Sequence, residues 1–194
     1  MRVTRPAIID QAGRQFNLDE ADGVNRRDTG ARVPQTTRNG TQEAGMQDRG
    51  ALLRHYRESR EALLAAIHGL TDAQLTDPSI DGWSVKDHLA HVALWDDLRA
   101  SEVTRISAGH ASAWRITDEQ AEAYNAMAYP ARRELSLAQV RWELQTSRAR
   151  LVDAIAAATP QGLDPSRYGE TGLRSDHEAE HTGWIKRWRG ERGF

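Results

Sequence analysis

The part of the chain that decides the fold is the stretch GWSVKDHLAHVALW, residues 82–95. Ser84 is a good N-cap, because its hydroxyl can accept a free backbone N–H of a first helical turn. Asp87, three residues later, completes a variant of the capping box, so a helix is predicted to begin sharply here. Apolar residues then recur at helical spacing as far as Gly109, which is predicted to stop the helix. That apolar row consists of Val85, Leu89, Val92, Val103 and Ile106.

Upstream of this stretch, a first helix is predicted from Asp48 to about Gly69. Its apolar row is interrupted only at Arg60. The row consists of Leu53, Tyr56, Leu63, Ile67 and Leu70. Residues 71–75 are predicted to form a loop or short turn, and the break continues at Pro78, since proline disfavours helix in the residue before it.

Downstream, a third helix is predicted to begin at Ser136, where Gln139 completes another capping box. It ends at Thr159–Gly162. A fourth helix is predicted over residues 174–188. The apolar row of the third helix consists of Leu137, Val140, Leu144, Leu151 and Ile155, with Ser147 in the same row.

The connection between the second and third helices is long, residues 110–135. Thr117 and Gln120 can cap a short helix inside it, and Pro130 is predicted to end that helix. No segment alternates apolar and polar residues as a half-buried strand does. We therefore predict an all-α fold, a four-helix bundle with a long crossover between helices two and three.

Residues 1–47 differ from the rest of the chain in composition. They hold one aromatic residue, Phe16, and no periodic apolar row, so we predict a disordered N-terminal extension and place the bundle in residues 48–194. The extension is either a harmless tail or, because Met46 stands at its end, an upstream addition to a shorter natural protein. Both interpretations leave the bundle as the functional part.

Charge and composition exclude several functional classes. The formal net charge is -2, which argues against a nucleic-acid-binding protein. There is no cysteine, so any metal must be bound by nitrogen and oxygen, and any thiol must come from outside. No apolar run approaches the length of a membrane span, and the N-terminus lacks the apolar region of a secretory signal. We therefore expect a cytoplasmic protein.

The last helix carries a histidine pair, His177 and His181. Side chains at i and i+4 share one helix face about 6 Å apart, so both imidazoles can reach one ion. About 0.2 such pairs are expected by chance, so the pair alone is a modest signal. Trp184, Ile185 and Trp188 continue the same face, which indicates that the pair points into the bundle. Two interpretations stay open: a shared metal ion, or core histidines bonded to carbonyl groups or water.

A third nitrogen ligand would complete a zinc-type site that keeps one open position. His91 is the best candidate, since it flanks the apolar row of the second helix and shares a face with Trp95. His88 is the competitor. It lies about 60° around the helix from His91 and is expected to point elsewhere. The remaining histidines are expected to be exposed or at helix ends, namely His55, His68 and His110.

Residues 82–95 resemble the second-helix motif of the DinB-like superfamily of metal-binding bundles, and most of all its DfsB-like and ClbS-like members. In that motif the ligand histidine follows the tryptophan by eight residues, so the resemblance selects His91 after Trp83. The His-x-x-x-His pair of the family's last helix matches His177 and His181. Asn125 resembles a residue of the crossover segment. The resemblance covers about residues 50–189 and departs from the pattern in residues 168–175, which are rich in glycine and look short.

The resemblance implies a divalent metal ion, zinc or nickel, held by His91, His177 and His181, and a low-molecular-weight thiol in some members. Relatives include thiol-dependent transferases or isomerases, and hydrolases of reactive small molecules. Two functions therefore stay open: an enzyme acting on a small electrophile, or a metal- or ligand-sequestering stress protein without turnover. A helical interaction protein with an inactive site is a third, less favoured possibility. A homodimer is also expected, since such bundles often pair.

Glu178 is the candidate catalytic base, with Glu180 and Asp96 as further proton acceptors. The letters His-Glu-x-x-His also occur in zincin metalloproteases, where such a glutamate is the general base. That alternative is disfavoured, because zincins take a third ligand downstream and hold peptides on a sheet edge. Glu178 has a simpler use as well: Ser175 and Glu178 have the spacing of a capping box.

Overall fold

The computed structural model describes residues 47–168 and 172–194, all of which fall within one compact unit of the chain. In these residues six α-helices form and no β-strand does, so the predicted all-α class is confirmed. The predicted N-terminal extension lies outside the described residues except for Gln47, and so do residues 169–171.

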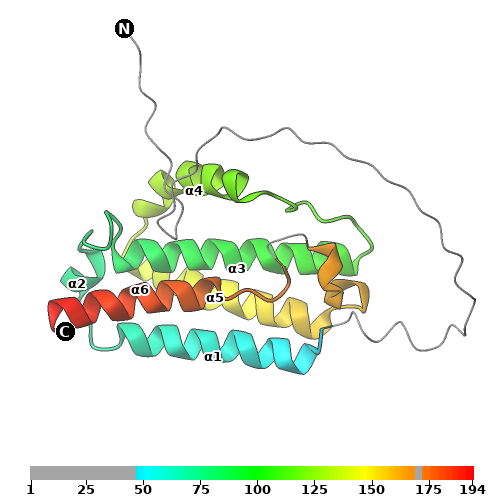
Figure 1. The fold of residues 1–194 in the computed structure, drawn as a ribbon, viewed down its shortest axis with the longest axis horizontal. Coiled ribbons are helices and arrows are strands. Elements are labelled where there is room, and N and C mark those ends of the chain that lie inside the picture. Colours follow the sequence, from blue (N-terminus) through cyan, green and yellow to red (C-terminus); the bar gives the residue numbers. More distant parts are fainter. Residues whose placement is uncertain (1–46, 169–171) are drawn as a thin grey trace, which may run out of the picture. The chain divides into compact units, whose positions relative to one another are not determined.

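Four long helices form the bundle (Figure 1). They are α1 (Arg49–Ile67), α3 (Val85–Ser107), α5 (Leu137–Ala157) and α6 (His177–Arg192). Each packs against two neighbours, in the cyclic order α1, α6, α3, α5. Figure 1 shows α1 and α6 running in one direction and α3 and α5 in the other. Because α3 and α5 are parallel neighbours, the chain between them must return along the bundle, which explains the long crossover.

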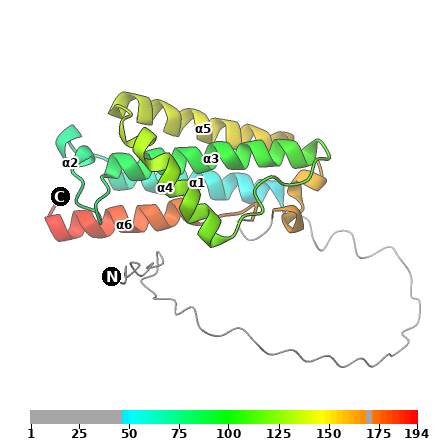
Figure 2. The ribbon, with the colours of Figure 1, turned by 90° about the horizontal axis from the view of Figure 1, so that it is seen from above.

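The crossover contains the helix α4 (Asp118–Arg133), which lies across α3 in both views (Figures 1 and 2). Thr117 caps α4 as predicted, in a capping box with Gln120. The prediction that Pro130 ends a short helix is wrong, since α4 continues to Arg133. The helix continues through Pro130 although a proline removes one helical hydrogen bond. No residue of α4 is buried, so α4 packs on the bundle without belonging to its core.

The other helix ends follow local side-chain chemistry. Ser84 and Asp87 form the predicted capping box of α3, and Ser136 and Gln139 form that of α5. The segment predicted as a loop or short turn after the first helix is the short helix α2 (Asp72–Thr76). Two 3-10 turns follow α5, at Gln161–Leu163 and Pro165–Arg167.

The predicted start of the last helix is corrected in two ways. α6 begins at His177 rather than near Arg174, and it runs past Trp188 to Arg192. The capping box of Ser175 and Glu178 does not form: Asp176 is the N-cap and makes no side-chain cap bond. The Glu178 carboxylate is directed into the bundle instead, where it meets two arginines.

A buried polar layer divides the core of the bundle in two. The apolar cluster on one side includes Leu63, Leu89, Val92, Val140, Leu144 and Ile185. The cluster on the other side includes Tyr56, Val103, Ile106, Leu151, Ile155 and Leu173. Between them, each long helix contributes one charged residue, and all four are at most 9% exposed: Arg60, Asp96, Arg148 and Glu178. Arg60 therefore points into the core like the apolar residues of its row, and the buried face of α1 is continuous at this position.

Candidate metal centre

Three histidines from two helices meet at one point of the bundle. His91 comes from α3, and His177 and His181 come from the first two turns of α6. The Nε2 atom of His177 lies 2.9 Å from Nε2 of His91 and 3.0 Å from Nε2 of His181. One nitrogen from each ring lies within 4.8 Å of the others, an arrangement that could hold a metal ion.

The geometry fits a tetrahedral metal ion. Zinc–imidazole bonds of about 2.0–2.1 Å at tetrahedral angles place the ligand nitrogens about 3.3 Å apart. The two distances to His177 are a few tenths of an ångström shorter, whereas the group of three spans up to 4.8 Å, so the rings would have to rotate to surround one ion. Three protein ligands leave a fourth position for water or another molecule. The donor set has no carboxylate, so it would leave the full charge of the ion uncompensated.

Burial keeps these imidazoles neutral, which is the form that binds metal. His91 is 6% exposed and His181 is 1% exposed. Desolvation lowers the pKa of His91 to about 3, with further lowering from His88 and Arg132. Desolvation and the neighbouring histidines also lower the pKa of His177 and of His181 well below the ordinary value. The site is therefore ready to receive a cation at neutral pH.

His88 does not point elsewhere, and that expectation is corrected. Its Nδ1 lies 2.8 Å from Nδ1 of His181, and its side chain is buried. An angular offset of 60° keeps both His88 and His91 on the face of α3 that packs against α6. His88 is not part of the three-nitrogen group that could hold the ion.

The comparison with known proteins agrees with this arrangement. The sequence matches the DinB superfamily over residues 55–185. The chain belongs to the DinB superfamily. The match spans α3 and both histidines of α6, and thus all three histidines of the candidate metal centre. No curated protein and no solved structure matches the chain.

In this DinB-superfamily bundle, aromatic rings surround the histidines. Each histidine has a tryptophan ring beside it. The distances between ring centres are 5.3 Å for Trp83 and His91, 6.0 Å for Trp95 and His177, and 4.7 Å for Trp184 and His181. Trp95 also donates a hydrogen bond from Nε1 to Oδ1 of Asn125 in α4, at 3.0 Å. The sequence comparison with the family had singled out Asn125, and the structure gives it this contact beside the centre.

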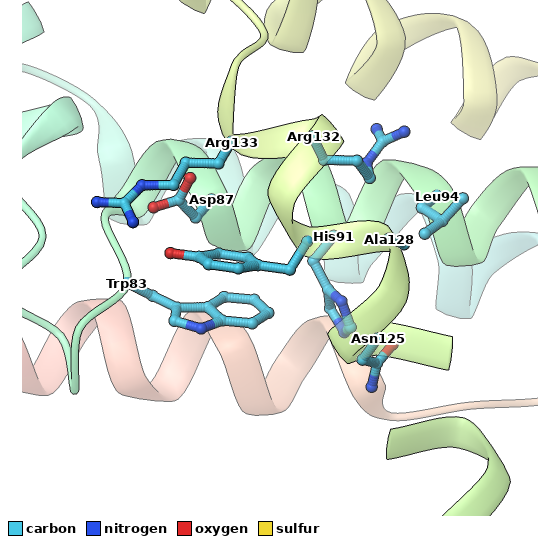
Figure 3. A pocket seen from close by; sticks show the side chains of 9 residues that line it. Trp83, Asp87, His91, Leu94, Asn125, Ala128, Arg132 and Arg133 are labelled. Atoms are coloured by element: carbon cyan, nitrogen blue, oxygen red, sulfur yellow. The ribbon is translucent and has the colours of Figure 1, made fainter. Parts of the chain in front are cut away.

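A pocket between α3 and α4 adjoins the centre (Figure 3). Its volume is about 10 Å³, enough for one water molecule. The Trp83 and Tyr129 rings stack beside it at 4.8 Å. Figure 3 shows His91 on one wall and Asn125 on the α4 side.

One oxygen in this pocket was not anticipated from the sequence. Asp87 is 5% exposed, and its Oδ2 is used in the capping box with Ser84. Its Oδ1 is buried and has no hydrogen-bond partner among the described residues. Asp87 lines the same pocket as His91. The sequence predicts the capping role of Asp87 but not its place in the lining of the pocket.

Glu178 and Asp96 lie instead in the polar layer. Both oxygens of Glu178 accept hydrogen bonds from arginines: Oε1 from Arg60 and Oε2 from Arg148, each at 2.6 Å. Ser59 donates to Oε2 as well. Asp96 accepts from the same two guanidinium groups. This geometry disfavours both carboxylates as bases, since their oxygens are already held by Arg60 and Arg148. Burial raises the pKa of Asp96 in spite of these arginines. Glu180 is exposed on α6.

The remaining histidines lie away from the group of three. His68 and His110 are exposed, as expected. The expectation for His55 is wrong: it lies inside α1 and is half-buried, and its Nε2 lies 2.9 Å from the carbonyl oxygen of Ser175. In the described part of the chain, no helix is both long and apolar enough to cross a membrane.

Proposed function

We propose that this protein is a metal-dependent enzyme that acts on a small electrophilic molecule, with zinc or nickel held by His91, His177 and His181. The observation that carries the proposal is the convergence of three neutral imidazoles, two buried and that of His177 half-buried, at a point that α4 adjoins but does not fill. When bound, such an ion lowers the pKa of a water molecule or an external thiol, which makes either of them a nucleophile near neutral pH.

The residues around the centre have separate tasks in this proposal. The three histidines hold the ion and supply no negative charge. Trp83 and Tyr129 form an apolar wall that excludes water from the substrate. Asp87 is a better candidate than Glu178 for accepting the proton of the nucleophile, since it lines the pocket of His91 and its Oδ1 has no hydrogen-bond partner among the described residues. The nearest relatives in function would be the DfsB-like and ClbS-like members, in which thiol-dependent transfer or isomerisation and hydrolysis of reactive molecules occur.

Metal analysis of purified protein tests the first half of the proposal. The wild-type chain should hold about one equivalent of zinc or nickel, and His91→Ala, His177→Ala and His181→Ala should each lose it, because two imidazoles hold an ion weakly. His110→Ala is the matched control and should retain the metal, since His110 is exposed. Circular dichroism verifies folding. A wild-type protein that stays metal-free after reconstitution would refute the proposal.

Turnover distinguishes an enzyme from a sequestering protein. The metal-loaded protein is offered a panel of small electrophiles, such as epoxides and activated esters, with and without a low-molecular-weight thiol. An enzyme converts many equivalents, and Asp87→Asn lowers kcat while keeping the metal and the capping bond. A protein of the sequestering type stops after one equivalent, and Asp87→Asn changes nothing. A cytoplasmic location and a homodimer belong to the same proposal, and size-exclusion chromatography tests the latter.

A further inference from the structure

His88 holds a position that the three-histidine site does not explain. Its side chain is 5% exposed and lies against α6, with its ring 5.0 Å from that of His181. The Nδ1 atoms of the two rings are 2.8 Å apart, a hydrogen-bond distance. Apolar side chains would fill this space without leaving polar atoms to satisfy. A buried histidine here therefore needs a reason.

The direction of this hydrogen bond follows from the metal site. His181 faces His177 through Nε2, so Nε2 must carry a lone pair to bind an ion. A neutral imidazole has one protonated nitrogen, so the proton of His181 must then lie on Nδ1. That N–H points at Nδ1 of His88. His88 must therefore accept at Nδ1 and carry its own proton at Nε2.

The second nitrogen of His88 agrees with this arrangement. Its Nε2 is buried and has no hydrogen-bond partner among the described residues. The rings of Trp83 and Trp184 lie beside it, at 5.2 Å and 5.8 Å between ring centres. The Nε2–H of His88 thus has no partner, whereas its Nδ1 is hydrogen-bonded to His181, a candidate metal ligand. A residue kept only for packing would not need that contact.

We propose that His88 is a positioning residue of the metal centre: its Nδ1 accepts the Nδ1–H of His181 and holds that ring with a bare Nε2 toward the ion. The inference rests on the proposed metal site. Metal-bound histidines usually donate their second N–H to a carboxylate, a carbonyl group or water. A neutral imidazole as the acceptor orients His181 without adding negative charge, which leaves the ion more electrophilic.

Two substitutions separate the hydrogen bond from the packing. His88→Asn keeps an acceptor oxygen near the position of Nδ1, and His88→Leu fills a similar volume without an acceptor. Both remove the unsatisfied Nε2–H. His110→Asn is the control on an exposed histidine. Zinc affinity is measured on the full chain by competition with a chromophoric chelator, and circular dichroism checks folding.

The expected result is a loss of zinc affinity of about 10- to 100-fold in His88→Leu, which is the usual effect of removing such a partner. His88→Asn should recover most of it, and His110→Asn should equal the wild type. Nitrogen-15 spectra of the zinc-loaded wild type should show His88 protonated at Nε2 and unprotonated at Nδ1. The spectra also decide the matter if His88→Leu does not fold.

Different failures have different meanings. If the wild type binds zinc and His88→Leu binds it equally well, His88 has no positioning role, and the metal site stands. If His88→Asn is as weak as His88→Leu, ring packing rather than the acceptor matters, and the inference is overturned. A zinc-loaded wild type in which His88 is protonated at Nδ1 overturns it too. If the wild type binds no zinc or nickel, the inference falls together with the proposed function.

Discussion

Acid should unfold the metal-free protein at a pH where most bundles are still stable. Desolvation lowers the pKa of His88 to about 4 and that of His91 to about 3. In the unfolded chain both side chains return to a pKa of about 6.5. As the pH falls through 6.5, the unfolded state takes up protons that the folded state cannot bind. The free energy of unfolding therefore decreases from about pH 6.5 down to the folded-state values.

The size of the effect at pH 5 depends only on the unfolded chain, since both histidines are still neutral in the folded protein. Each histidine then lowers the free energy of unfolding by about 2 kcal/mol relative to pH 8, so the two together lower it by about 4 kcal/mol. His177 and His181 shift in the same direction. A typical domain has only about 5–15 kcal/mol of stability. The loss is thus a large part of the total.

Urea unfolding of metal-stripped protein between pH 8 and pH 5, followed by circular dichroism, measures this loss. His91→Leu removes one of the groups and should weaken the pH dependence by about 2 kcal/mol at pH 5. His110→Leu is the control and should keep the full dependence. A urea midpoint that stays constant from pH 8 to pH 5 would refute the reasoning, and so would a His91→Leu variant with an unchanged slope.

Four further predictions concern the rest of the molecule. Arg60→Met should destabilise the bundle by about 3–5 kcal/mol, because it leaves Glu178 short of one of its two cations, and adding Glu178→Gln should recover part of the loss in urea unfolding. Ser136→Ala should cost about 1 kcal/mol through the lost cap of α5, which thermal melting would detect as a lower Tm. A chain beginning at Met46 should keep the Tm and metal content of the full chain, and a marked drop in either would contradict this. Duplex DNA should not bind at submicromolar concentration in a salt-sensitive manner, given a net charge of -2, as fluorescence anisotropy would check.

The helix starts could be predicted from the sequence because both partners of each cap lie within four residues. Ser84, Thr117 and Ser136 all accept the predicted N–H group. The same rule failed at Ser175 and Glu178, where a contact from far along the chain competed for the glutamate. Arg60 and Glu178 are 118 residues apart, and no local pattern reveals such a pair.

The histidines illustrate the same limit. The pair His177 and His181 follows from spacing on one helix, and the resemblance to the family selected His91. The role of His88 depends on how α3 packs against α6, which brings residues 93 positions apart into contact. Arg60 stands in an apolar row, and only the fold shows that the row passes through a buried charged layer. A charged residue in an apolar row is thus a cue to search for oppositely charged partners in the same row of other helices.

The absence of any buried residue in α4 has a consequence for how this protein could change over evolution. Substitutions at surface positions usually alter stability by less than about 0.5 kcal/mol. Most positions of α4 could therefore vary with little effect on folding, although Asn125, Ala128 and Tyr129 border the pocket of His91. In an enzyme of the proposed kind, the bundle would keep the metal chemistry constant while α4 adapts to new molecules. A library randomised only at these three positions would sample altered selectivity in variants that still fold.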